Sequence, residues 1–167
     1  MSDLLIREAR DADRAAIHDV TLAAYEEYAP RMAPALWRGY RQNIVATLAA
    51  PAPALQLVAE DGGAIAGTVL LYPPASGDYP RPWPEVRLLA VAPAARGRGV
   101  GGALMRECVR RARASGAAVL SLHTTDLMRV AMAMYERMGF VRAPELDLTP
   151  APGVVIKGFR LDLASAP

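Results

Sequence analysis

Cysteine is almost absent from this chain: Cys108 is the only one in 167 residues. A single cysteine excludes an internal disulfide and is typical of a protein that works in a reducing compartment. No apolar run approaches the ~18 residues that a membrane helix requires. Residues 1–14 carry charged side chains too early for a secretory signal. We therefore expect a cytoplasmic protein with no membrane partner.

Lysine and net charge are also scarce. Only Lys157 among the 19 basic residues is a lysine, and the formal net charge of +2 is too small to indicate nucleic acid as a partner. The arginines within 106–113 form a possible nucleic-acid stripe, but cations near a helix C-terminus favour a solvated face. No spacing of His, Cys and acidic residues indicates a metal site. We expect neither nucleic acid nor metal.

The length and composition fit one folded domain. Hydrophobic residues make up 53% and charged residues 22% of the chain, and no repeat or interdomain linker is visible. We expect a single domain over 1–167, with its core at about 4–163, present as a monomer or homodimer.

Hydrophobic periodicity predicts helices and strands in alternation. Helices are expected within 11–28, 29–53, 101–115 and 126–138. Strands are expected at 4–9, 54–61, 64–72, 85–91, 117–122, 140–143 and 154–163. Asp11 or Asp13 would cap the first helix and Asp126 the last. This order predicts an α/β fold with a mixed sheet and helices on both faces.

One stretch, "ARGRGVGGALM" at 95–105, places four glycines and two arginines just before a helix. Backbone amides freed by small residues at the positive end of a helix suit an anion, above all a phosphate. The predicted anion-binding residues run without a break: Arg96, Gly97, Arg98, Gly99, Val100, Gly101 and Gly102. The alternative is that the glycines only shape a turn and the arginines are solvated.

The anion is not obvious from these letters alone. "GRGVGG" formally matches the dinucleotide fingerprint, but that fingerprint follows its strand directly and opens a series of βαβ units. Here residues 92–96 intervene, and no Gly-Lys-Ser/Thr tripeptide of a nucleotide-hydrolase loop occurs. The residues therefore favour a different diphosphate carrier, with a nucleotide-binding module as the weaker alternative.

The stretch 85–142 resembles the GNAT superfamily of N-acetyltransferases. Arg96, Gly99 and Gly101 match its cofactor motif, and "AMAMYERMGF" at 131–140 is similar to its last helix, with a tyrosine four residues before a Gly-Phe pair. The resemblance implies a mostly antiparallel, splayed central sheet. It also implies direct transfer of an acetyl or other acyl group from acetyl-CoA to an amine acceptor within a ternary complex. A non-catalytic acyl-CoA-binding sensor is the alternative.

The resemblance also implies roles for single residues. The strand residues Leu89, Ala90 and Val91 would lie along the pantetheine arm, and a backbone amide there would face the developing oxyanion. Glu85 would be the base that removes the amine proton, with His123 or a water molecule as alternatives. Tyr135 would give a proton to the departing thiolate. Each of these side chains also has a purely structural interpretation.

Two further expectations follow from the resemblance. Met128 stands where many relatives carry a cofactor-contacting asparagine, so contact from that helix is in doubt. The acceptor would lie among the first two helices and the loop at 73–84. The candidate acceptor-binding residues are Glu26, Tyr28, Trp37, Trp83 and His123. None of them identifies the acceptor.

Overall fold

The computed structural model describes residues 3–76 and 80–164. The chain divides into two compact units. The first unit contains the described residues up to Leu71 together with Leu88–Glu107, and the second contains Tyr72–Arg87 and the described residues from Cys108 onward. The expectation of a single domain stays a prediction.

The first unit begins with an antiparallel sheet. β1 (Leu5–Glu8) pairs with β2 (Leu55–Asp61), which pairs with β3 (Ala64–Tyr72). The predicted strands at 54–61 and 64–72 are present as β2 and β3 and form a hairpin, in which Gly62 and Gly63 have φ of 58° and 85°. Two consecutive positive φ angles match the right-handed twist of the flanking strands, which is why glycine occupies this turn.

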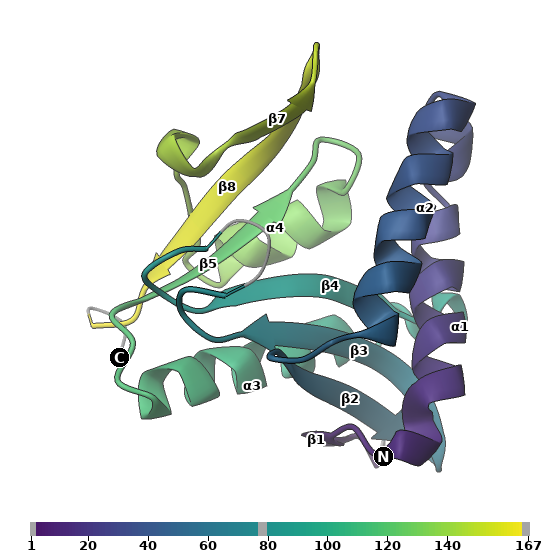
Figure 1. Ribbon diagram of the computed structural model, residues 1–167. Coiled ribbons are helices and arrows are strands. Elements are labelled where there is room, and N and C mark those ends of the chain that lie inside the picture. Colours follow the sequence, from purple (N-terminus) through teal and green to yellow (C-terminus); the bar gives the residue numbers. More distant parts are fainter. Residues whose placement is uncertain (1–2, 77–79, 165–167) are drawn as a thin grey trace. The chain divides into compact units, whose positions relative to one another are not determined.

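Two long helices, α1 (Arg14–Glu26) and α2 (Pro34–Ala49), lie side by side in the first unit (Figure 1). The side chains they bury belong to the core of this unit together with those of β2 and β3. This core includes Ile17, Leu22, Ile44, Leu57, Val58, Val69 and Leu70. Within the described residues of both units there are four short 3-10 helices, η1 to η4: Asp11–Asp13, Ala29–Arg31, Pro93–Ala95 and Pro144–Leu146.

The start of α3 (Val100–Ala114) is packed closely against β3 and the end of β4 (Glu85–Val91). A Cβ atom added to Gly67 of β3 would lie 2.8 Å from Val100 Cγ1 and 2.9 Å from the Ala90 carbonyl oxygen. A side chain at position 67 would therefore push these elements apart. The absence of a side chain at Gly67 therefore lets the start of α3, which follows the glycine-rich turn, pack closely against β3.

In the second unit, the first residues of β4 pair in parallel with β5 (Val119–Thr124). β5 pairs antiparallel with β8 (Val154–Asp162), and β8 also pairs with β6 (Val141–Arg142) and β7 (Leu148–Ala151). Figure 1 shows β7 and β8 extending together beyond β5. Apart from β4 with β5, these strand pairs are antiparallel, so the predicted mixed α/β fold with a mostly antiparallel sheet is confirmed.

Both helix-capping expectations need correction. Asp13 does precede α1, but its carboxylate accepts hydrogen bonds from Arg7 and from the Arg10 amide instead of capping α1. Asp126 forms an ion pair with Lys157, and α4 (Arg129–Arg137) begins after Met128 with no side-chain cap. In both cases the carboxylate pairs with a cation from another element, and it does not cap the helix that the local sequence predicted.

Candidate functional site

The glycine-rich turn has the backbone conformation that an anion site requires. Gly97 and Gly99 have φ of 73° and 80°, a left-handed region that side chains strongly disfavour. The first i to i−4 hydrogen bond of α3 runs from the Ala103 amide to the Gly99 carbonyl oxygen. The amides of the preceding first turn of α3 have no acceptor within the helix and lie at its positive end. These are the amides that the sequence predicted for a phosphate.

The two arginines of this turn are each paired with an acid of the same unit. Arg96 forms an ion pair with Glu27, which follows α1, and Arg98 forms one with Asp61 at the end of β2. About two-fifths or more of each arginine side chain remains exposed. Both guanidinium groups are thus held at the turn, and each has an internal carboxylate that competes with an incoming anion.

The strand β4 is interrupted just before the residues expected to bind the pantetheine arm. Leu88 has φ of 50°, a left-handed conformation that costs a residue with a Cβ about 1–2 kcal/mol. The interruption resets the alternation of side chains, so Glu85 and Leu89 no longer share a face by strand parity alone. The Leu89 carbonyl oxygen accepts a hydrogen bond from the Tyr25 hydroxyl at 3.1 Å. The backbone of β4 is therefore hydrogen-bonded to a side chain of α1.

Glu85 is buried, not a solvated glutamate at a strand end. It is 4% exposed, and its Oε1 atom lies 2.7 Å from Nδ1 of His123 and 3.4 Å from Nε of Arg87. The other ring nitrogen of His123, Nε2, lies 2.8 Å from the Leu146 carbonyl oxygen. The structure thus brings together the two residues that the sequence offered as alternative bases.

Tyr135 is a buried residue of α4, 6% exposed, and its ring packs at a tilt against Phe140 with centroids 5.9 Å apart. Met128, which stands at the position of the family asparagine, is the residue that precedes α4.

Thr124, at the end of β5, is 2% exposed, and its hydroxyl has no hydrogen-bond partner among residues 3–76 and 80–164. A buried hydroxyl without a partner is costly, so this position suits contact with a ligand or water.

The aromatic acceptor candidates of the first unit form one cluster. The rings of Tyr28 and Trp37 are linked through Tyr25 and Tyr40, with successive ring centroids 5.9–6.1 Å apart and edge-to-face geometry. Desolvation by burial raises the pKa of Tyr28. Because Tyr25 also donates to Leu89, this cluster is attached to the strand expected to hold the thioester. Glu26 is exposed, with Arg41 at 3.8 Å.

Trp83 belongs to the second unit. It lines a depression of about 370 Å³ together with Pro74, Pro82, Pro84 and Ser115–Val119. Its Nε1 atom is buried and has no hydrogen-bond partner in the part of the chain that the structure describes. The predicted acceptor loop at 73–84 also contains residues 77–79, which lie outside the described residues.

Sequence reasoning missed several members of the site. Leu88 carries no signal of its special conformation, because leucine is an ordinary strand residue. The carbonyl of Leu146 is equally invisible, since backbone atoms carry no residue code. Tyr25 was a candidate for enclosing the acceptor by its residue type, but its hydrogen bond to the Leu89 carbonyl oxygen was not predicted.

Within the described residues, no helix has the length and apolar character that a membrane crossing requires. The same residues contain no group of three or more His, Cys, Asp or Glu side chains arranged to hold a metal ion.

Curated relatives share part of this chain. It is 38% identical over 105 residues to mycothiol acetyltransferase of Nocardia farcinica, covering 63% of this chain and 32% of that protein. It is 35% identical over 85 residues to probable N-acetyltransferase family 8 member 5 of Mus musculus, covering 51% and 37% respectively. The chain thus spans about a third of the length of these relatives.

Solved structures extend the likeness to the whole fold. A GNAT family acetyltransferase from Brucella melitensis, solved in complex with acetyl-CoA, has a TM-score of 0.66 and 28% identity, over 98% of this chain and 89% of that one.

Residues 14–140 of this chain match the Acetyltransferase (GNAT) family. This match includes the glycine-rich turn, β4 and the tyrosine of α4. The chain belongs to the Acetyltransferase (GNAT) family.

Proposed function

We propose that this protein transfers an acetyl group from acetyl-CoA to an amine. The observation that carries the proposal is the glycine-rich turn, where left-handed Gly97 and Gly99 lead into the first turn of α3. Family membership and the acetyl-CoA complex of the Brucella melitensis relative support the same cofactor. The buried, disulfide-free Cys108 suits the cytoplasm. The protein would act as a monomer or a homodimer.

The residues at this turn fit the diphosphate of coenzyme A. A Cβ atom built on Gly97 or Gly99 would point into open space, so a phosphate has room to approach the backbone there. The amides of Val100, Gly101 and Gly102 supply neutral donors, and Arg96 and Arg98 supply charged ones. Bound at this turn, acetyl-CoA would supply the thioester from which the acetyl group is transferred.

The catalytic roles are assigned to residues of this chain. A protonated amine has no lone pair, so a base must remove a proton before attack on the thioester carbonyl. We assign that proton transfer to the Glu85 carboxylate, which is buried and anchored by His123. Tyr135 would donate a proton to the thiolate sulfur of coenzyme A. The amides of Leu89 or Ala90 would stabilise the negative charge on the attacked oxygen.

The acceptor class follows from the helices of the first unit. The cluster of Tyr25, Tyr28, Trp37 and Tyr40 offers aromatic faces, and Glu26 adds negative charge on the exposed surface of α1. Aromatic faces and a carboxylate attract a cationic amine. We therefore infer an amine-bearing small molecule or peptide as the acceptor.

Calorimetric titration and an acceptor screen test this function together. We expect acetyl-CoA to bind with micromolar affinity, on the order of typical enzyme substrates, while NAD and ATP bind far more weakly. A screen over amine classes, read out as free thiol, should then identify the acceptor. Binding of acetyl-CoA without thiol release for any amine would favour a sensor. Tight NAD binding with no acetyl-CoA binding would refute the proposal.

A further inference from the structure

Glu85 and His123 form a buried pair that the fold itself aligns. In the parallel register of β4 and β5, Glu85 lies opposite Ser121. His123 is two residues further along β5, so it shares the face of Ser121. The side chains of Glu85 and His123 are 5% and 10% exposed, and Oε1 and Nδ1 are 2.7 Å apart.

The second contact of His123 fixes where its protons lie. Nε2 is 2.8 Å from the Leu146 carbonyl oxygen, and a carbonyl oxygen only accepts hydrogen bonds. Nε2 therefore carries a hydrogen in every form of the pair. Nδ1 then either donates to the Glu85 carboxylate or accepts from Glu85 in its acid form. In both forms the imidazole has no lone pair free to take a proton from an amine.

The carbonyl that holds Nε2 is itself held in place. A Cβ atom added to Gly158 of β8 would lie 2.4 Å from Leu146 Cβ, so η4 is packed directly on a backbone that only glycine permits. Asp147, the next residue, accepts a hydrogen bond from the Gly158 amide at 2.9 Å and two from Arg142 at 2.6 Å. Leu146 is thereby fixed between Gly158, on which it packs, and the anchored Asp147.

Charged groups surround the pair on several sides. Arg87, on β4, lies 3.4 Å from Glu85 Oε1, and Arg81 Nη2 is 3.4 Å from the same Leu146 carbonyl that His123 contacts. Asp147, the residue after Leu146, adds a carboxylate on this side of the pair and is bonded to Arg142. Among residues 3–76 and 80–164, the contacts of the Glu85 carboxylate with His123 and with Arg87 are both made by Oε1. Oε2 is therefore the oxygen left to receive a proton.

We propose that His123 is a positioning residue that donates its Nδ1 hydrogen to Oε1 of the Glu85 carboxylate, so that Oε2 takes the proton of the acceptor amine. The proposal rests on the proposed function. In this step R–NH3+ loses one proton and becomes R–NH2, and Glu85 gains that proton and becomes a carboxylic acid. Glu85 returns it to water after the product leaves. Nε2 and the Leu146 carbonyl keep the imidazole from rotating during the exchange.

Two matched variants separate positioning from packing. The asparagine amide nitrogen in His123→Asn stands near the position of Nδ1, whereas the glutamine amide in His123→Gln stands near Nε2. We expect H123Q to lose kcat by about 30- to 100-fold, because a misplaced base is worth about that factor. KM for both substrates should change little. H123N should stay within about fivefold of the natural protein.

An equal loss in both variants, with equal thermal stability, would reduce His123 to a packing residue and overturn the proposal. H123Q as active as the natural protein would overturn it as well. If the natural protein acetylates no amine, the proposed function fails, and the positioning role of His123 fails with it. The three results differ, so failure of the function and failure of the inference are distinguishable.

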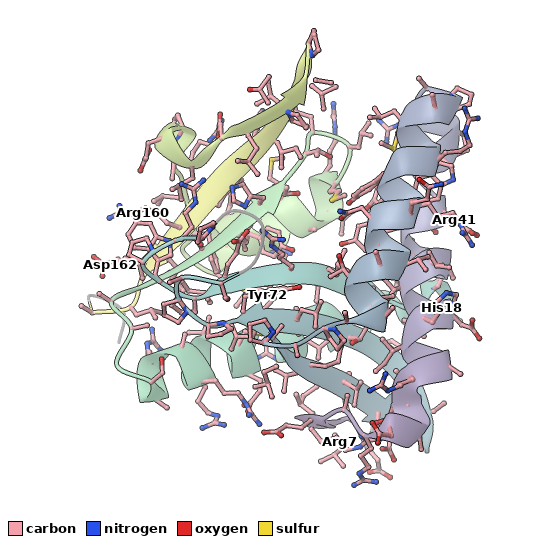
Figure 2. The ribbon with its side chains drawn as sticks, viewed as in Figure 1. Arg7, His18, Arg41, Tyr72, Arg160 and Asp162 are labelled. Carbon is pink, nitrogen blue, oxygen red and sulfur yellow. The ribbon has the colours of Figure 1, made fainter. Side chains whose placement is uncertain are left out.

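A spectroscopic measurement on the ligand-free protein tests the pair without any activity. The chain has two histidines, and His18 lies on α1 with 44% of its side chain exposed, which makes it an internal reference (Figure 2). In the ¹⁵N spectrum of the imidazoles, we expect Nε2 of His123 to carry a proton on both sides of neutral pH. A bare Nε2 in the folded protein would overturn the proposal even if the enzyme were active.

Discussion

The guanidinium of Arg96 forms an ion pair with the carboxylate of Glu27, which joins the glycine-rich turn to the end of α1. Both side chains are more than two-fifths exposed. An exposed pair of this kind contributes at most about 1 kcal/mol. It nevertheless opposes anion binding, because a diphosphate and Glu27 compete for the same donor.

Glu27→Gln should therefore strengthen acetyl-CoA binding. Removal of the competing carboxylate frees Arg96, and we expect the dissociation constant to fall by about two- to fivefold, the equivalent of an exposed ion pair. Glu26→Gln is the matched control, since it removes the same charge one residue away, beside Arg41. Calorimetry measures both. Equal tightening in the two variants would mean that net charge, not the pair, sets the affinity.

Gly99→Ala should weaken acetyl-CoA binding by at least about tenfold. The variant adds a methyl group at a φ of 80°, and that methyl would project into the open space where the phosphate must approach. Gly62→Ala introduces the same left-handed strain in the β2–β3 hairpin, also in open space. If both variants lose stability but bind acetyl-CoA as the natural protein does, the diphosphate does not lie at this turn.

The helices, most strands and the glycine-rich turn were predictable from sequence because their signals are local. The Asp61-Gly62-Gly63 turn and the Gly139 stop of α4 require positive φ, and the structure has it at Gly62, Gly63 and Gly139. The strand β7 was missed because Pro150 argues against a strand, and only its pairing with β8 at one edge permits it.

Contacts between distant elements escaped sequence reasoning. Asp13 and Asp126 have the residue type of helix caps, yet Arg7 and Lys157 compete for them in space. Glu85 and His123 were read as rivals because they are 38 residues apart, and only the parallel register of β4 with β5 reveals them as a pair. Local patterns predict local geometry. Contacts between strands also depend on the pairing register, which local sequence patterns do not reveal.

Glu85→Gln should lower turnover at neutral pH by about 100-fold or more, the usual range for a lost general base. The loss should shrink as pH rises, because a larger fraction of the amine is already neutral. Acetyl-CoA affinity should stay the same, which serves as the control for folding. A rate ratio between variant and natural protein that stays constant across pH would remove Glu85 as the base.

Tyr135→Phe should slow turnover while cofactor binding stays nearly the same. Phenylalanine keeps the ring that packs against Phe140, so the substitution removes only the phenolic hydroxyl. We expect a loss of about tenfold to 100-fold in kcat, since a thiolate leaves tolerably well without an acid. Phe140→Leu is the packing control and should cost stability more than rate. Full activity of Y135F would assign Tyr135 to packing alone.

Asp13→Asn should destabilise the protein at neutral pH and matter less in acid. Arg7, at the foot of α1 (Figure 2), donates two hydrogen bonds to the Asp13 carboxylate, and these bonds together with the Arg10 amide lower its pKa from 3.8 to about 2. A lowered pKa means that the stabilisation is fully present above about pH 4 and is lost as pH falls toward 2.

At pH 7 we expect D13N to reduce the free energy of unfolding by about 1.5–3 kcal/mol, the range for hydrogen bonds to charged groups. Urea unfolding of both proteins from pH 7 down to pH 2.5 should show the difference narrowing below pH 4. Asp11→Asn is the control, because the Asp11 side chain is 99% exposed and its substitution weakens an exposed contact of 3.5 Å with Arg14. Its cost should be under about 0.5 kcal/mol. A difference for D13N that persists unchanged into acid would show that shape, not charge, accounts for the role of Asp13.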